Sequence, residues 1–415
     1  MTTPVKELGA RSQAASRALA LASTDEKNKA LEICATLLVE RSAELLAANA
    51  QDLSVAADQG MGPTPLDRLR LTPERIESMA AGLRQVATLP DPIGEVLDGV
   101  RRPNGLEIER VRVPLGVVAV IYENRPNVTC DAAGICIKSG NAALLRGSST
   151  AQHSNLFIAA TLQAGLAQTG LPVDSVLLVE DQSHEEAIAL MQLNDFVDCL
   201  IPRGGPDLIS SIRQNATVPV IIDGDGNCHV YVDQAADLDE ALAIVVNSKT
   251  NRPGVCNAAE SLVVHESVAD TFLPLVTAEL AKSGVEMRGD EKARARVEMT
   301  AACDDDFARE FLDLTMSVVV VSDLTQAIAH INHYGTGHTE AIVTSDLDAA
   351  RRFTREIDAA AVIVNASTRF TDGERFGFGA EIGISTQKLH ARGPMGLREL
   401  TTYKYLIWGT GQVVS

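Results

Sequence analysis

The chain has 415 residues, of which 46% are hydrophobic and 22% charged, and its net charge at pH 7 is −19. This length predicts about two or three domains, and the acidic balance argues against a nucleic-acid partner, which requires a basic face. The apolar stretches are short and interrupted by charges, and residues 1–10 lack the apolar segment of a secretory signal, so we expect neither a membrane span nor export.

Seven cysteines are spread along the chain without any Cys-x-x-Cys pair. Their odd number and wide spacing favour neither a disulfide framework nor a zinc site. We therefore expect free thiols in a reducing, cytoplasmic setting, and no metal centre.

The first 87 residues have the periodicity of helices, and we see no chemistry in them. Ser23 is typical of a helix cap, and the apolar stripe behind it predicts one long helix to about residue 57. Thr72, Pro73 and Glu74 then indicate another helix start.

Between residues 94 and 114, apolar and charged residues alternate on both sides of Asn104-Gly105. An Asn-Gly turn between alternating runs is a strong signal for a β-hairpin. This hairpin is either an arm that extends the sheet of a neighbouring subunit or a solvated flap of its own domain, and the sequence leaves both open.

From Gly116 onward, short apolar runs alternate with helical segments, which predicts a parallel sheet covered on both faces. The expected strands are residues 117–122, 142–145, 176–179, 199–202 and 218–222, and the expected helices are residues 128–138, 151–169, 185–193 and 207–214.

Loops that follow such strands are where cofactors bind. One loop contains Arg146, Gly147, Ser148 and Ser149, and another contains Gly204 and Gly205 after Arg203. The first offers a cation, hydroxyl groups and a flexible backbone for a phosphate, and the second precedes a helix whose N–H groups suit an anion. Glycine-rich turns of this kind that bind no ligand are at least as common.

A second set of strands and helices predicts another α/β domain. Its expected strands are residues 261–265, 318–321, 341–344 and 361–364, and its expected helices are residues 238–248, 268–282, 324–332 and 347–356.

Cys256 lies in this second set, in a polar loop at residues 251–258 that Pro253-Gly254 bends. A reactive thiolate needs hydrogen-bond donors or positive charge nearby. Arg252 and the backbone N–H groups of the turn are candidates for both. The alternative is a small buried hydrophobic side chain, which is what most free cysteines are.

The tail at residues 369–415 combines a Gly-rich loop at 376–379 with a strand-like end at 403–408. Its basic residues are close together: Lys388, His390, Arg392, Arg398 and Lys404. In a chain of net charge −19 such density indicates an anion pocket or an interface, unless the tail is simply solvated.

Several of these stretches resemble the aldehyde dehydrogenase superfamily. Residues 113–118 with Glu123-Asn124-Arg125-Pro126 are similar to its strand and Trp-Asn-Phe-Pro turn, residues 140–148 to its Gly-Asn-x-x-x-x-Lys-Pro-Ser, and residues 251–256 to its Asn-x-Gly-Gln-x-Cys. More narrowly, residues 121–129, 364–373 and 384–397 resemble the gamma-glutamyl phosphate reductase family. The likeness covers nearly the whole chain and implies that Cys256 is a nucleophile.

The resemblance implies an α/β fold of two doubly wound parallel-sheet domains with a β-hairpin and C-terminal oligomerisation arm. We expect N-terminal helices and the dinucleotide-binding domain in residues 1–226, with the hairpin arm at 94–114. The catalytic domain with Cys256 is expected in residues 227–366. Residues 367–415 are expected to return to the cofactor domain and the interface of a homo-oligomer.

The resemblance also implies that NADPH reduces L-glutamate 5-phosphate to L-glutamate 5-semialdehyde, with release of phosphate and NADP+, which is the second step of proline biosynthesis. Cys256 would attack the acyl carbonyl and expel phosphate, so that a thioester divides one difficult step into two. The oxyanion needs fixed donors, and by position these are Asn124 and the backbone N–H of Cys256.

Two departures from the superfamily pattern are informative. The glutamate of its water-activating Glu-Leu-Gly-Gly segment is missing from residues 222–227, Ile-Asp-Gly-Asp-Gly-Asn, which fits reduction better than hydrolysis. Ser149 stands where NAD-preferring relatives often carry an acid, and Arg146 replaces the lysine, which favours NADPH. Glu310 resembles the glutamate that holds the nicotinamide ribose.

The substrate carries a phosphate and an α-carboxylate, which cations bind well. The candidates are Arg252, Arg369, Lys388, His390 and Arg392, and Asp372 or Glu381 for the α-amino group. A structural salt bridge would explain any one of these cations equally well.

Two rival interpretations stay open. One is another acylating or hydrolytic aldehyde dehydrogenase, although the missing glutamate argues against hydrolysis. The other is a non-catalytic scaffold for a partner such as glutamate 5-kinase, although the intact Cys256 and Asn124 argue against it. A transient complex with that kinase is a separate hypothesis, because acyl phosphates hydrolyse readily.

Overall fold

The computed structural model describes residues 2–414, which divide into two compact units. Unit 1 runs up to Ile222 and includes Phe378–Gly383 and the segment from Met395 onward, and unit 2 comprises Asp223–Gly377 and Ile384–Pro394. The C-terminal tail therefore contributes to both units. No helix in the described range is long and apolar enough to cross a membrane.

Unit 1 begins with five helices: α1 (Val5–Leu19), α2 (Thr24–Glu40), α3 (Ser42–Asp58), α4 (Pro63–Leu69) and α5 (Pro73–Thr88). Ser23 caps α2 and Thr72 caps α5, each by accepting a hydrogen bond from a backbone N–H three residues later. Both predicted helix starts are thus confirmed.

The single long helix predicted to residue 57 is wrong, because the chain breaks at Arg41 into α2 and α3. The Arg41 guanidinium lies 4.4 Å from the ring centre of Phe157 and donates a 3.1 Å hydrogen bond to Thr161 Oγ1. Both partners belong to α7 (Gln152–Thr169), so a tertiary contact accompanies the break.

A four-stranded parallel sheet with the order β5-β4-β3-β6 forms the centre of unit 1. Its strands are β3 (Val117–Tyr122), β4 (Ala142–Arg146), β5 (Val176–Leu178) and β6 (Cys199–Arg203), and the helices between or after them are α6 (Asn127–Lys138), η1 (Ser149–Ala151), α7, η2 (Val173–Ser175), α8 (His184–Met191) and α9 (Pro206–Asn215). All six residues of β3 are buried, as expected of a strand with neighbours on both sides.

The strand predicted at residues 218–222 is wrong. Val220 makes only an isolated bridge to Leu200. Pro219 has no N–H to donate to a sheet, and its carbonyl oxygen accepts the Leu200 N–H instead. The segment therefore touches β6 without extending the sheet.

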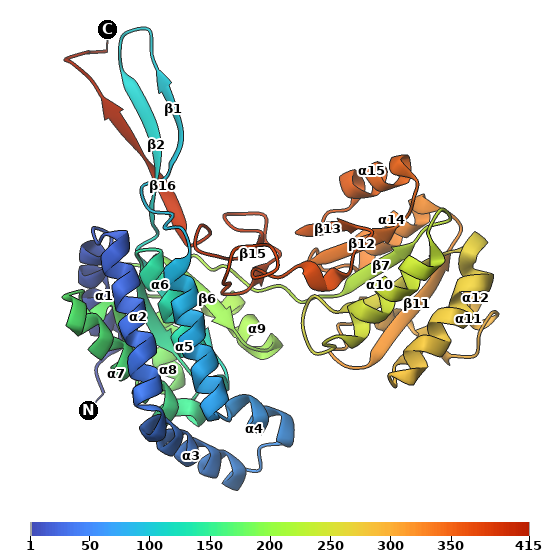
Figure 1. Ribbon diagram of the computed structural model, residues 1–415, viewed down its shortest axis with the longest axis horizontal. Coiled ribbons are helices and arrows are strands. Elements are labelled where there is room, and N and C mark those ends of the chain that lie inside the picture. Colours follow the sequence, from blue (N-terminus) through green and yellow to red (C-terminus); the bar gives the residue numbers. More distant parts are fainter. Residues whose placement is uncertain (1, 415) are drawn as a thin grey trace. The chain divides into compact units, whose positions relative to one another are not determined.

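The predicted hairpin is confirmed as β1 (Val96–Arg101) and β2 (Glu107–Pro114), which pair antiparallel. The last strand, β16 (Thr401–Trp408), pairs with β2 along its whole length. Figure 1 shows this three-stranded sheet projecting from the helices of unit 1.

Unit 2 contains a seven-stranded parallel sheet with the order β10-β9-β11-β8-β7-β12-β13. Its strands are β7 (Cys228–Val232), β8 (Ala259–His265), β9 (Glu286–Gly289), β10 (Thr300–Ala301), β11 (Thr315–Val321), β12 (Thr339–Val343) and β13 (Ala361–Val364). The helices of unit 2 are α10 (Leu238–Thr250), α11 (Glu266–Lys282), α12 (Glu291–Arg294), α13 (Asp304–Ala308), α14 (Leu324–Tyr334), α15 (Leu347–Glu356) and η3 (Thr368–Phe370). In the tail segment of this unit, β14 (Ile384–Ser385) pairs with β15 (Gly393–Pro394).

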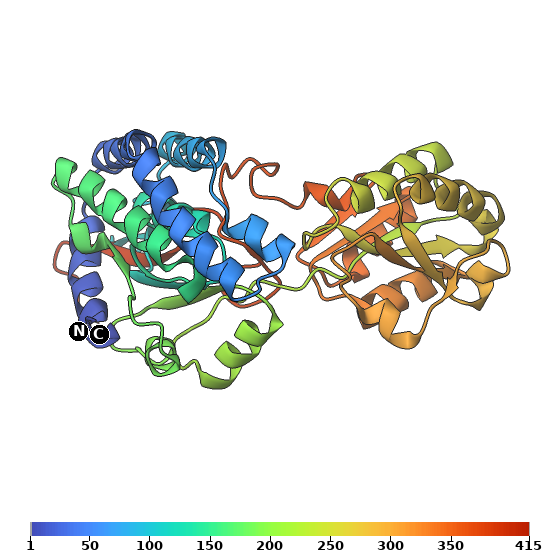
Figure 2. The same ribbon diagram turned by 90° about the horizontal axis from the view of Figure 1, so that it is seen from below.

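Helices cover both faces of this sheet (Figure 2). On the interior strand β7, Val230 and Val232 pack in the core formed with α10 and α11, whereas Tyr231 packs in the core formed with α14 and α15. Successive side chains of a strand point to opposite faces, so both faces of β7 are apolar. The predicted fold class, with two parallel sheets, is confirmed.

Candidate active site

Cys256 lies in unit 2, in the turn between the end of α10 and the start of β8, and it is half-buried. Of the other six cysteines, five are buried and Cys303 is exposed. The Cys256 carbonyl oxygen accepts a 3.1 Å hydrogen bond from Cys228 Sγ. The Cα of Gly226 packs so closely below it that a Cβ there would lie 1.6 Å from this oxygen. The close backbone packing against Gly226 therefore fixes the conformation of the turn, while the Cys256 side chain stays partly accessible to solvent.

A buried ion pair closes this turn. Lys249 Nζ, in the last turn of α10, lies 2.6 Å from Glu260 Oε2, near the start of β8, and both side chains are inaccessible to solvent. Glu260 Oε1 accepts a 3.2 Å hydrogen bond from the Leu312 N–H. Burial raises the pKa of Glu260 to about 7 and lowers the pKa of Lys249. Neither residue was singled out in the sequence, because nothing in their local pattern shows that they meet.

Two of the predicted cations lie near the thiol. Arg252 is exposed, and Arg369 Nε donates a 3.3 Å hydrogen bond to Asn251 Oδ1. Burial lowers the pKa of Arg369, with a further lowering from the charge of Arg252 and an opposing effect of Cys256. Arg252 belongs to the same turn as Cys256, and Arg369 bonds to Asn251 at the start of that turn, so the turn carries positive charge that favours a thiolate.

Glu310 also belongs to the surroundings of this turn. Its Oε1 accepts a 2.7 Å hydrogen bond from the N–H of Gly226, the glycine that packs below Cys256. Burial raises the pKa of Glu310, and the charges of Asp225 and Asp223 raise it further. In this structure the carboxylate supports the floor of the turn.

The remaining predicted cations have other contacts in unit 2. Lys388 Nζ and Arg392 Nη2 both contact the Asp358 carboxylate, at 2.5 and 2.8 Å. His390 has a left-handed backbone with φ of 69°. Asp372 accepts hydrogen bonds from the N–H groups of Glu374 and Arg375. Salt bridging to Asp358 therefore accounts for two of the five cations.

Asn124 lies in unit 1, directly after β3, with φ of 34°. Asn tolerates this left-handed region better than most residues. Its Oδ1 accepts hydrogen bonds from Ser148 Oγ, at 2.9 Å, and from Thr150 Oγ1. Because two hydroxyl groups occupy Oδ1, the amide is oriented with Nδ2 as its donor end. Ser148, predicted as a phosphate ligand, thus also positions Asn124.

The first predicted phosphate loop is tightly packed. Arg146 Nη2 donates to the carbonyl oxygens of Gln182 and Ser183 at 3.2 and 3.1 Å, and burial lowers the pKa of Arg146. A Cβ at Gly147 would lie 2.1 Å from Asn155 Nδ2. Ser149 begins the 3-10 turn η1. The loop keeps its cation, although the guanidinium already bonds to the protein.

A carboxylate from the loop after β3 contacts the second predicted phosphate loop. Glu123 Oε2 accepts a 2.9 Å hydrogen bond from the N–H of Gly205, at the N-terminus of α9. A Cβ at Gly204 would lie 2.7 Å from the Glu123 carboxyl carbon. The helix end does bind an anionic group here, and a cofactor phosphate at this N–H would require Glu123 to turn away. Glu123 was not predicted as a site residue, although it precedes Asn124.

The candidate residues thus fall into two sets. Unit 1 holds Asn124 and the two phosphate loops, and unit 2 holds Cys256, Glu310 and the cations. Within residues 2–414, no group of three or more His, Cys, Asp and Glu side chains has the arrangement of a metal site.

Comparison with known proteins gives a consistent result. The sequence matches the aldehyde dehydrogenase family over residues 3–314 and 314–405. A gamma-glutamyl phosphate reductase from Clostridium beijerinckii is 54% identical over 406 residues, 98% of each chain, and one from Carboxydothermus hydrogenoformans is 54% identical over 410 residues, 99% of each. The crystal structure of gamma-glutamyl phosphate reductase from Thermotoga maritima is similar with a TM-score of 0.98 and 48% identity, over 100% of both chains.

Proposed function

The chain belongs to the aldehyde dehydrogenase family, and from its full-length relatives we propose that it is an oxidoreductase of proline biosynthesis. It reduces L-glutamate 5-phosphate to L-glutamate 5-semialdehyde and phosphate, with NADPH as the reductant, in the cytoplasm. The observation that carries the chemistry is the half-buried Cys256, which lies in a turn held by the Lys249–Glu260 ion pair and the Arg369–Asn251 hydrogen bond.

In the proposed mechanism the Cys256 thiolate attacks the acyl carbon of the mixed anhydride. The C–O bond to phosphate breaks, and a thioester forms. Asn124 Nδ2, which its contacts with Ser148 and Thr150 leave as a donor, stabilises the oxyanion together with the Cys256 N–H. Once hydride has been added to the thioester carbon and the oxyanion has taken up a proton, the resulting thiohemiacetal collapses, which releases the aldehyde and returns the thiol.

The nicotinamide cofactor supplies the hydride that reduces the thioester. The residues of unit 1 fit a dinucleotide: the loop after β4 offers hydroxyl groups, and the α9 N-terminus after β6 offers an N–H that binds the Glu123 carboxylate. Position 149 in the loop after β4 carries a serine instead of an acid, and Arg146 in the same loop is a cation. Both features favour a 2′-phosphate and therefore NADPH. In unit 2, Glu310 is assigned to the ribose side of the same cofactor.

Absence of a water-activating glutamate supports reduction over hydrolysis. The matching stretch at residues 222–227 contains Asp223, whose Oδ1 accepts a 2.6 Å hydrogen bond from the Ile384 N–H. Asp223 therefore contributes to the local fold. A thioester protected from activated water persists long enough to be reduced.

Arg252 and Arg369 are proposed to bind the departing phosphate, because they share the surroundings of the thiol. Lys388, His390 and Arg392 are proposed to bind the α-carboxylate. For Lys388 and Arg392 this requires sharing with Asp358, which is exposed enough for solvent to weaken its ion pairs.

We also propose a homo-oligomer formed through the hairpin sheet. The edge strand β16 exposes four large apolar side chains: Tyr403, Tyr405, Ile407 and Trp408. An unpaired edge of this kind favours strand pairing with another chain. Sedimentation of a Tyr405→Lys/Ile407→Lys variant should show smaller particles than wild type; equal size would refute this assembly.

Association with glutamate 5-kinase is a further proposal, tested by a joint mass after gentle cross-linking.

The mechanism can be tested by trapping its covalent intermediate. Glutamate 5-kinase, ATP and glutamate generate the acyl phosphate beside the enzyme in the absence of reductant. Intact-mass and peptide analysis should find a glutamyl adduct on Cys256 and none in Cys256→Ser. An adduct on another cysteine, or none under conditions in which the kinase turns over, would contradict the proposed nucleophile.

A further inference from the structure

Unit 2 contains a pocket of about 390 Å³, and Cys256 is not among its lining residues. It lies at the N-terminal ends of β12 and β13, between the end of α14 and the tail segment at residues 386–392. Its polar lining residues include Asn332, Thr336, Glu340, Asp358, Thr386 and Arg392. The volume is within the usual range for small-molecule sites.

Glu340, in the wall of this pocket, is 1% exposed and only half satisfied. Its Oε2 accepts hydrogen bonds from the His229 N–H and from His229 Nδ1, at 2.8 and 2.9 Å. Its Oε1 has no hydrogen-bond partner among the described residues. Buried polar atoms are nearly always hydrogen-bonded, so a free carboxylate oxygen in a pocket wall indicates a missing donor.

Arg392 supplies the complementary feature. Its Nη2 contacts Asp358, but its Nε is buried and also has no hydrogen-bond partner within the described part of the chain. The pocket lining therefore contains a carboxylate oxygen without a donor, on Glu340, and a guanidinium N–H without an acceptor, on Arg392. With Asp358 and Lys388 included, the wall contains two carboxylates and two cations.

We propose that this pocket binds an α-amino acid group, with its ammonium on Glu340 Oε1 and its carboxylate on Arg392. A zwitterion matches a wall of balanced charge, whereas a simple anion or cation would leave one of the two unpaired atoms without a partner. Glu340 Oε1 and Arg392 Nε indicate a zwitterionic ligand whatever reaction the protein performs. Only the assignment of the ligand to the amino-acid end of the substrate rests on the proposed function.

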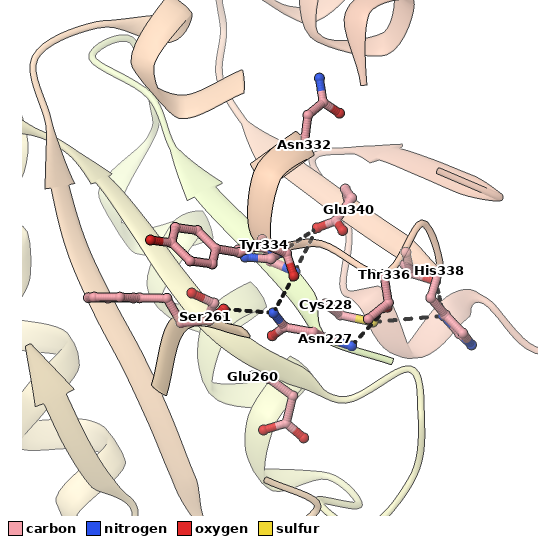
Figure 3. A network of polar contacts seen from close by, with 12 residues as sticks. Asn227, Cys228, Glu260, Ser261, Asn332, Tyr334, Thr336, His338 and Glu340 are labelled. Carbon is pink, nitrogen blue, oxygen red and sulfur yellow. Dashed lines mark hydrogen bonds and ion pairs between the residues drawn. The ribbon is translucent and has the colours of Figure 1, made fainter. Parts of the chain in front are cut away.

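The pocket is connected to the Cys256 turn through Thr336. Thr336 Oγ1 accepts a 3.1 Å hydrogen bond from the Asn227 N–H and donates a 2.5 Å hydrogen bond to the Asp225 carbonyl oxygen. These two residues flank Gly226, which packs below Cys256. Figure 3 shows Thr336, Asn227 and Glu340 in one polar network. Occupation of the pocket is therefore expected to change the rate at which Cys256 is alkylated.

Titration calorimetry of the full chain tests the proposal with L-glutamate as the probe. Glutarate, which lacks the ammonium group, and 4-aminobutyrate, which lacks the α-carboxylate, serve as matched controls. L-Glutamate should bind saturably with a dissociation constant no weaker than millimolar, and each control at least tenfold more weakly. Equal binding of glutarate, or no saturable binding of L-glutamate, would overturn the proposal.

Variants locate the binding. Glu340→Gln removes the charge and keeps the shape, and Arg392→Met, at the pocket rim, covers the case that a change at the buried Glu340 prevents folding. Each should weaken L-glutamate binding at least tenfold, while Arg355→Gln, an exposed arginine on α15, should not. Unchanged binding in both pocket variants would place the ligand elsewhere and overturn the assignment.

Two further measurements separate the source of the ligand from the proposed reaction. If glycine and L-alanine bind as well as L-glutamate, the pocket senses free amino acids; if they do not, it holds the amino-acid end of the substrate. Reductase turnover without any binding in the pocket would refute this inference alone. Binding without turnover would refute the proposed function and leave the pocket assignment intact.

Discussion

The buried ion pair between Lys249 and Glu260 makes a quantitative prediction about stability. Lys249→Met removes the cation and leaves a carboxylate that is inaccessible to solvent. Breaking one partner of such a pair typically costs about 3–5 kcal/mol, because the remaining group must stay buried either as an unpaired charge or protonated at a pH where the unfolded chain ionises it. We expect a loss of this size at pH 8.

The loss should depend on pH. Burial already raises the pKa of Glu260 to about 7, and Lys249 counteracts this shift, so the pKa rises further in Lys249→Met. A group whose pKa is raised on folding adds stability in its protonated form, and that stability is lost as the pH rises from the unfolded pKa to the folded one. Below pH 7 Glu260 is protonated in both folded proteins. Above pH 7 it ionises only in wild type, so the gap should widen by about 1.4 kcal/mol per pH unit.

The measurement is denaturant unfolding followed by circular dichroism at pH 6, 7 and 8. Lys249→Met/Glu260→Gln is the matched control, because the amide keeps an acceptor for the Leu312 N–H without a charge. This double variant should recover most of the stability and lose the dependence on pH. A single variant that loses less than about 1 kcal/mol at pH 8, or the same amount at pH 6 and pH 8, would refute the reasoning.

Three further changes probe the site. Asn124→Ala should lower kcat about 100- to 1,000-fold with little change in KM, because it removes an oxyanion donor; an unchanged kcat in steady-state assays would exclude that role. Glu123→Gln should tighten NADPH binding about two- to fivefold in fluorescence titration, because the carboxylate no longer competes for the N-terminus of α9; weaker binding would mean that Glu123 contacts the cofactor. Gly226→Ala should destabilise the fold by about 1–3 kcal/mol in thermal unfolding and slow alkylation of Cys256, since its Cβ would overlap the turn. Gly62→Ala, with open space around it, is the control, and equal effects of the two would contradict this packing argument.

The sequence predicted most elements because their signals are local. The alternation around Asn104-Gly105 marked the hairpin, and the caps at Ser23 and Thr72 marked two helices. The break at Arg41 was missed because the residues on both sides favour helix and the contact with α7 is tertiary. The false strand at residues 218–222 came from weighing apolar residues above Pro219.

For the site, the sequence pointed to a cysteine in a bent loop, but not to what surrounds it. Glu260 was hidden because its partner Lys249 is eleven residues away in sequence and meets it only in the fold. The bond from Glu123 to Gly205 likewise joins two loops that are 82 residues apart. Such pairs depend on which strand ends are neighbours, and that is a property of the sheet order.

The reverse reaction tests the thioester mechanism most directly, because acyl phosphates are difficult to keep. The enzyme is mixed with L-glutamate 5-semialdehyde and NADP+, with and without inorganic phosphate, and the reduced cofactor is followed by absorbance in wild type and in Cys256→Ala. We predict turnover that requires both phosphate and Cys256. Turnover without phosphate would indicate a hydrolytic dehydrogenase, and turnover in Cys256→Ala would contradict the thioester mechanism.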